Sequence, residues 1–123
     1  MSYFVYLFVF FAALFGLTAA HADSNPAVGK LAVQCARVGK LEGIFAQAFY
    51  TGDKPLDEAS RDAVKLLVQR HTTPDLAAAI VAQATDFISK HPGVSPLVVE
   101  NAAYAKCMIN LGLDPLTPKP DVN

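Results

Sequence analysis

The sequence contains no tryptophan, only two cysteines, and no Lys, Arg, Asp or Glu among its first 22 residues. Its ten basic and eleven acidic side chains give a formal net charge of −1. That balance excludes binding to nucleic acid or to a membrane surface through bulk positive charge. The length of 123 residues excludes a multidomain enzyme. Because alternating strand-like runs are also missing, we expect one all-α domain.

The uncharged N-terminal segment has the pattern of a secretory signal peptide. Residues 3–20 are nearly all apolar, and Ala20-His21-Ala22 has the small-x-small form of a cleavage site. We therefore predict a signal peptide over residues 1–22 and a periplasmic or extracellular protein. No basic residue precedes the apolar run, and its roughly 18 residues are the lower limit for spanning a bilayer. An uncleaved N-terminal anchor is the alternative, and the only membrane contact that we expect.

Proline, capping residues and glycine divide the body into four helices, predicted at residues 26–50, 55–70, 74–90 and 96–111. Thr73 and Ser95 are the predicted N-caps of the last two. Gly52 and Gly112 are predicted to end the first and the last in a left-handed conformation. The short connections favour an up-down-up-down four-helix bundle over residues 23–112. Residues 113–123, with three prolines, are predicted to form a flexible tail.

Cys35 and Cys107 lie on the apolar faces of the first and last helices. In an antiparallel pair these positions come close together, and an exported protein meets oxidising conditions. We predict a structural disulfide that joins helices 1 and 4. A redox role is not expected without a Cys-x-x-Cys motif. A metal is not expected either, because His71 and His91 lack ligand spacing; the sequence also contains no cofactor motif.

Glu42 and Glu100 are carboxylates on otherwise apolar faces. Glu42 follows Cys35 by seven residues and Glu100 precedes Cys107 by seven, so the disulfide would make the two glutamates neighbours. They could reach water at the bundle edge, form a structural salt bridge with a basic side chain, or form a functional acidic pair that binds a ligand amine or a metal. Two carboxylates close together and away from water cannot both ionise cheaply.

Small residues form a strip on each of these two helices. Gly39 and Gly43 stand in the middle of the first helix, where glycine lowers helix stability and so needs a reason. Packing within the bundle, a homodimer face and a ligand groove are the alternatives. On the last helix, Ala102 and Ala105 are flanked by Val98 and Ile109. Together with the two glycines of the first helix, these four residues form the candidate interface: Gly39, Gly43, Val98, Ala102, Ala105 and Ile109.

The outline of a leader, a helical body, and an early and a late cysteine resembles that of many small secreted bacterial proteins, immunity proteins of type VI secretion systems among them. The last helix is apolar almost all round and is expected beside Gly39 and Gly43. We therefore expect non-catalytic binding of a protein partner through helices 1 and 4, as by an immunity, inhibitor or chaperone-like protein. A homodimer is the other expected partner.

Two other functions stay open. The first is a carrier of a small apolar ligand, whose site would be lined by Phe45, Phe49, Leu67, Phe87 and Met108. With so few large side chains in the body, however, we expect a filled core. The second is a small enzyme that uses Glu42 and Glu100; we expect no enzymatic activity.

Overall fold

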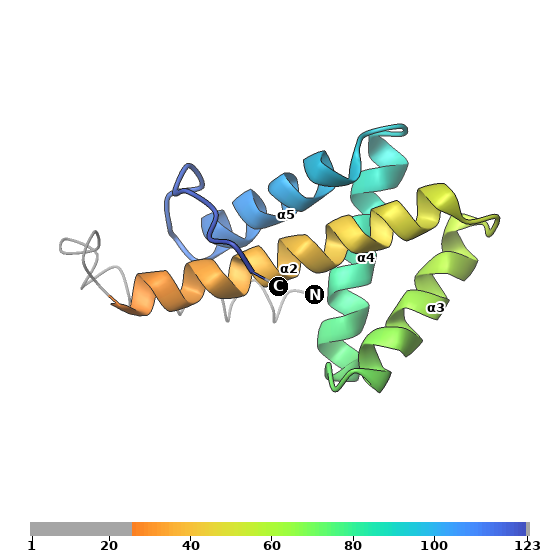
Figure 1. Cartoon of the computed structure of the whole chain (residues 1–123), viewed down its shortest axis with the longest axis horizontal. Helices are drawn as coiled ribbons and strands as arrows, with labels where there is room; N and C mark the ends of the chain where they lie inside the picture. Colours follow the sequence, from red (N-terminus) through yellow and green to blue (C-terminus); the bar gives the residue numbers. More distant parts are fainter. Residues whose placement is uncertain (1–25, 123) are drawn as a thin grey trace. The chain divides into compact units, whose positions relative to one another are not determined.

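The computed structural model describes residues 26–122, and the predicted signal peptide, residues 1–22, lies outside them. The described chain forms four helices: α2 (Pro26–Thr51), α3 (Leu56–Gln69), α4 (Pro74–Lys90) and α5 (Pro96–Asn110) (Figure 1). Every helix end lies within one residue of its predicted position, so the all-α fold is confirmed. None of these four helices is long and apolar enough to cross a membrane.

The predicted helix ends at proline and glycine are confirmed at several positions. The Thr73 side chain accepts a hydrogen bond from the Leu76 amide at 3.4 Å, and the Ser95 side chain accepts one from the Val98 amide at 3.2 Å. Both caps precede a proline, whose fixed φ suits the first helical residue. At the end of α5, Gly112 has a φ of 74°, the left-handed conformation that favours glycine.

Gly52 was also predicted to end its helix in a left-handed conformation, and this prediction is wrong. Gly52 is not among the residues with positive φ, whereas His71, just after α3, has a φ of 70°. The His71 amide donates to the Val68 carbonyl at 3.1 Å and the Thr72 amide to the Leu67 carbonyl at 3.0 Å. These two bonds satisfy the last carbonyls of α3 in the way that a glycine normally permits.

The described chain divides into two compact units, and α2 and α5 each contribute to both. The first unit comprises residues 26–37 and 104–122. The second unit comprises residues 38–103, including all of α3 and α4. The up-down-up-down order of the whole bundle and the predicted domain limits stay predictions.

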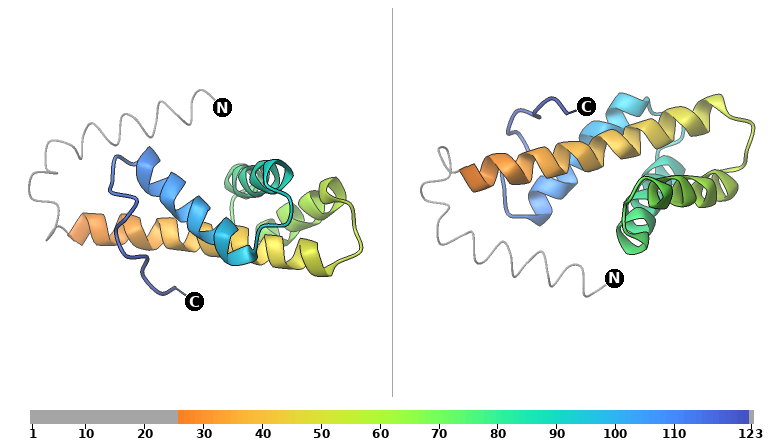
Figure 2. Two further views of the ribbon diagram at one scale, coloured as in Figure 1. Left: turned by 90° about the horizontal axis from the view of Figure 1, so that it is seen from above. Right: turned by 60° about the horizontal axis from the view of Figure 1, so that its bottom comes forward.

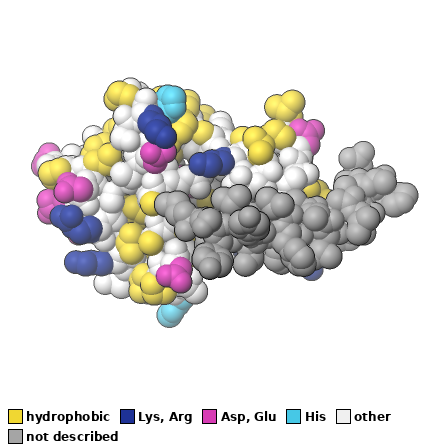
Figure 3. Space-filling model, turned by 180° about the vertical axis from the view of Figure 1, so that it is seen from behind, with side chains coloured by type: hydrophobic (Ala, Val, Ile, Leu, Met, Phe, Trp, Pro, Cys, Tyr) yellow, Lys and Arg dark blue, Asp and Glu magenta, His cyan; other side chains and the backbone are white. Residues whose placement is uncertain are grey.

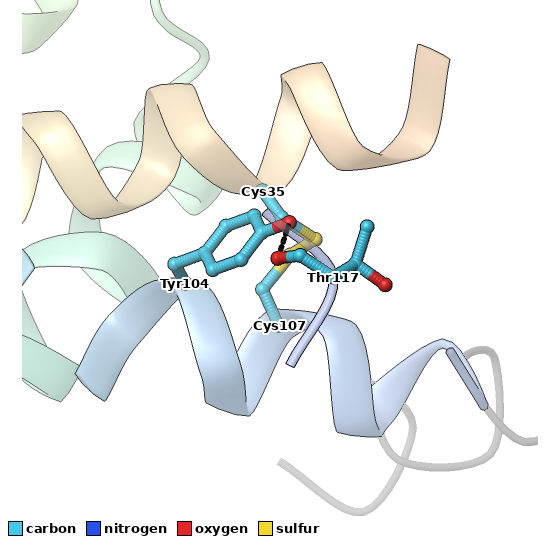
Figure 4. The surroundings of a disulfide bond; sticks show 4 residues. All are labelled: Cys35, Tyr104, Cys107 and Thr117. Carbon is cyan, nitrogen blue, oxygen red and sulfur yellow. Dashed lines mark hydrogen bonds between the residues drawn. A yellow bond between two sulfur atoms is a disulfide. The ribbon is translucent and has the colours of Figure 1, made fainter. Parts of the chain in front are cut away.

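The first unit is held together by the Cys35–Cys107 disulfide (Figure 4), which confirms the predicted link between the first and last helices of the body. The two Cα atoms are 5.4 Å apart. Small and medium apolar side chains surround the bond, and the segment after α5 adds to them. The buried members of this cluster are Ala32, Cys35, Ala36, Tyr104, Met108 and Leu111, with Leu113 and Val122 packed against them.

The second unit is built on a hairpin of α3 and α4. In Figures 1 and 2, α4 lies steeply across the second half of α2. The Ser60 and Thr85 hydroxyls form a hydrogen bond of 2.7 Å between α3 and α4. The core of this unit consists of Phe45, Ala46, Val81, Ala84, Ile88 and Val99. No residue of α3 is buried, so its apolar face is only partly covered.

Candidate functional site

An apolar groove of about 330 Å³ lies wholly within the second unit, between α2, α3 and α4. Its α2 wall repeats at intervals of three and four residues, the spacing of one helix face. The side chains of this wall are Leu41, Ile44, Phe45, Ala48 and Phe49. Phe45 is anchored in the core, whereas Ile44 at the rim is 55% exposed. This face of α2 therefore lines the groove with aliphatic and aromatic carbon.

The opposite wall of the groove comes from α3, and α4 supplies Ile80 and Val81. The apolar side chains of the α3 wall are Ala59, Ala63, Leu66 and Leu67. Leu66 is 48% exposed although it belongs to the apolar face of a strongly amphipathic helix. A filled core was expected from the sequence; the groove is an opening at the surface of the second unit, beside its buried core, and this expectation did not include it. Since α4 crosses α2 steeply, the α3 face is left partly uncovered.

The charged residues of the groove lie at its two ends. Asp53 and Lys54 belong to the connection between α2 and α3, and Lys54 forms an exposed ion pair with Asp62. This pairing raises the pKa of Lys54 and lowers the pKa of Asp62. At the other end, Arg70 lines the groove and takes part in no ion pair with any described residue.

The structure brings together only three of the five side chains that were predicted to line a carrier site, and the carrier function itself stays a prediction. Phe45, Phe49 and Leu67 line the groove, whereas Phe87 packs against the core of the second unit. Met108 is fully buried in the first unit, beside the disulfide. A helical wheel identifies apolar faces but not the helix that covers each face, which explains the mixed result.

The predicted acidic residues lie where α2 and α5 meet within the second unit. Glu42 is 1% exposed, and Glu100 is half-buried. A Cβ atom built on Gly43 would lie 3.0 Å from the Glu100 Cβ and 3.1 Å from the Pro96 carbonyl oxygen. Glu100 thus packs against the residue next to Glu42, and the pairing of the two carboxyl groups stays a prediction. Glu42 does not line the groove, so the groove gives no support to catalysis by this residue.

The six residues of the candidate interface divide into two kinds. Gly39 and Gly43 are buried, and Gly43 lies tightly against α5, as packing within the bundle requires. On α5, Ala102 and Ala105 are half-buried, whereas Val98 and Ile109 are exposed. On the face shown in Figure 3, hydrophobic side chains lie among interspersed positive and negative ones. Contact of these residues with another chain stays a prediction.

Comparison with known proteins finds no family model, curated protein or solved structure that matches this chain. Among residues 26–122, no group of three or more His, Cys, Asp or Glu side chains is placed to hold a metal ion. The groove of the second unit and the charges at its ends are therefore the features from which we infer a function.

Proposed function

We propose that this chain is an exported, non-catalytic binding protein that holds an apolar ligand in the groove of the second unit. The observation that carries this proposal is the groove itself, whose walls are apolar faces of α2 and α3. Its volume of about 330 Å³ falls within the range of small-molecule sites. The disulfide is consistent with an oxidising compartment, and the periplasm or extracellular space is part of the proposal.

The hydrophobic effect gives the reason for binding. Large side chains such as Ile44 and Leu66 are about half exposed on facing walls, and their hydration is unfavourable. An apolar ligand would remove carbon surface on both walls from water at once, at about 25 cal/mol per Å² of surface. Contiguous exposed apolar surface of this kind marks binding sites in many proteins.

The test uses N-phenyl-1-naphthylamine, an uncharged probe whose fluorescence rises in apolar surroundings. Ala48 is exposed and lines the groove, so Ala48→Phe fills the site without disturbing buried packing. We expect this variant to weaken probe binding by about tenfold or more. Ala82→Phe places the same ring on an exposed position of α4 outside the groove and should bind the probe as the wild type does.

Two results would contradict the proposal. One is a wild-type protein that does not bind the probe. The other is equal binding by the two phenylalanine variants, because the probe would then lie elsewhere. Helical circular dichroism of each variant serves as the control for folding.

A second candidate function is the binding of a protein partner, as by an immunity, inhibitor or chaperone-like protein, through α5. The supporting observation is the exposure of two neighbouring apolar side chains at the start of α5, Leu97 (61%) and Val98. If these residues join two copies of the chain, light scattering should give a dimer mass for the wild type and a monomer mass for Val98→Lys. A wild-type monomer would exclude the homodimer.

A further inference from the structure

We infer that the ligand of the groove is a single-chain anionic amphiphile, such as a long-chain fatty acid, whose carboxylate binds Arg70. This inference rests on the proposed function and adds the chemistry and the direction of the ligand. The hydrocarbon chain would lie along α2 and α3 towards the connection between them. Three observations carry it: the apolar walls, the lack of an ion pair between Arg70 and any of residues 26–122, and the unequal charges of the two ends.

The end of the groove at the connection between α2 and α3 is unfavourable for an anionic head. The positive charge of Lys54 is offset by its ion pair with Asp62. Asp53 adds a further negative charge at this end. Asp53 and Asp62 both line this end. An anionic head would therefore meet two carboxylates and one cation that is already paired.

The opposite end of the groove is favourable for an anion. The last part of α3, residues 63–69, contains Lys65 and no acidic residue, and Arg70 follows it directly. The Arg70 side chain is exposed at the groove and has no ion pair within the described chain. A guanidinium presents a planar set of donors that matches a carboxylate in a bidentate geometry.

The dimensions of the groove suit an extended hydrocarbon chain. From Ala59 to Arg70, the lining residues of α3 extend over about 16 Å at 1.5 Å per residue. Between these two positions the α3 wall is apolar except for Asp62 at the connection end. The volume of about 330 Å³ is small, so one chain fits better than the two chains of a phospholipid.

The test compares dodecanoate, dodecanol and dodecyltrimethylammonium, which have the same hydrocarbon chain and different heads. Each compound displaces N-phenyl-1-naphthylamine from the disulfide-bonded protein, and the displacement gives its affinity. We expect dodecanoate to bind about tenfold more tightly than dodecanol, the usual size of one charge-assisted contact. Arg70→Gln should remove this preference and leave the affinity for dodecanol unchanged.

Arg61→Gln is the control, because it removes the same charge from α3, the helix that Arg70 follows, at a position outside the groove. It should keep the preference for dodecanoate. Ala48→Phe should weaken all three compounds, because it fills the part of the groove that their chains share.

Other outcomes would overturn the inference. Equal affinities for dodecanoate and dodecanol, both weakened by Ala48→Phe, would leave the groove as a binding site but remove the role of Arg70. Tighter binding of the cationic compound would place the head at Asp53 instead. A concentration-dependent dimer that excludes the probe and that dodecanoate does not dissociate would make a second copy the occupant. Absence of binding by the probe and by all three compounds would contradict the proposed function itself.

Discussion

The two units of this protein are stabilised in different ways. The first unit brings together two segments far apart in the chain through a disulfide, around a buried cluster that includes two alanines, Tyr104 and Met108. The second unit, which contains no disulfide, has the three phenylalanines of the described residues and most of the β-branched core residues, yet it leaves the apolar face of α3 partly exposed. The unit with the covalent link is thus the one without the groove.

This difference suggests a division of roles. Binding surfaces are often found in the less stable parts of a protein, where local opening has a low free-energy cost. An open apolar groove lacks stabilising contacts on one side, and the second unit has this property. We expect the disulfide to hold the segments of the first unit together while the second unit adapts to a ligand.

The largest effect is expected from removal of the disulfide. The two cysteines are separated by 72 residues, and chain-entropy reasoning gives a loss of about 4 kcal/mol on opening a loop of this size. The melting temperature of the Cys35→Ala/Cys107→Ala variant should fall by more than about ten degrees. Hydrogen exchange should show that amides of the first unit lose protection before those of the second. Equal loss in both units would contradict the contrast.

The next largest effect on the free energy of unfolding is expected at the glycines of α2. Two of them are compared, one in each unit. A Cβ on Gly43 would lie 3.0 Å from the Glu100 Cβ and 3.1 Å from a backbone oxygen, so Gly43→Ala should destabilise the protein by about 1–3 kcal/mol through overpacking. A Cβ on Gly29 meets nothing within 4 Å. Gly29→Ala should therefore stabilise by about 0.5–1 kcal/mol. Urea denaturation measures both, and a stable Gly43→Ala variant would show that the α2–α5 contact is loose.

A smaller effect concerns the segment after α5. The Tyr104 hydroxyl donates a hydrogen bond of 3.1 Å to the Thr117 carbonyl oxygen (Figure 4), so Tyr104→Phe should lose about 0.5–1.5 kcal/mol. Burial raises the pKa of Tyr104. The folded state therefore binds this proton more tightly than the unfolded state, and the stabilisation is lost above about pH 10.

The pH dependence of this variant separates the hydrogen bond from general packing. Between neutral and strongly alkaline pH, the free energy of unfolding of the wild type should fall more steeply than that of Tyr104→Phe. Parallel curves for the two proteins would show that Tyr104 does not titrate differently in the folded state.

The smallest effect is expected at the buried carboxyl group of the second unit. Glutamine has nearly the shape of glutamate, and burial in an apolar environment disfavours a charged side chain. We expect the free energy of unfolding of Glu42→Gln at neutral pH to lie within about 1 kcal/mol of the wild type. A loss above about 2 kcal/mol would show that an ionised Glu42 makes a contact on which the fold depends.

The sequence predicted the helices and the disulfide well because local chemistry determines them. Thr73 and Ser95 before prolines mark helix starts, and two cysteines on apolar helix faces leave one pairing. The left-handed ends were predicted less well: Gly112 behaves as expected, whereas His71 takes a conformation that sequence reasoning assigns to glycine.

The groove could not be predicted, because it depends on the way in which α4 crosses α2. Leu67 was predicted to line an apolar site and does line the groove, but the helical period does not say which neighbour covers an apolar helix face. The spacing of Lys54, Asp62 and Arg70 in the sequence could have indicated charges along one side of α3. Their placement at opposite ends of a groove needed the structure.

Residue-resolved amide exchange with and without N-phenyl-1-naphthylamine shows which of the two units binds the probe. If the second unit is the binding unit, the probe should slow exchange along the groove walls, in residues 41–49 and 59–67. The amides of residues 104–113 beside the disulfide should be unchanged. Protection gained around the disulfide, with none along α3, would contradict the account.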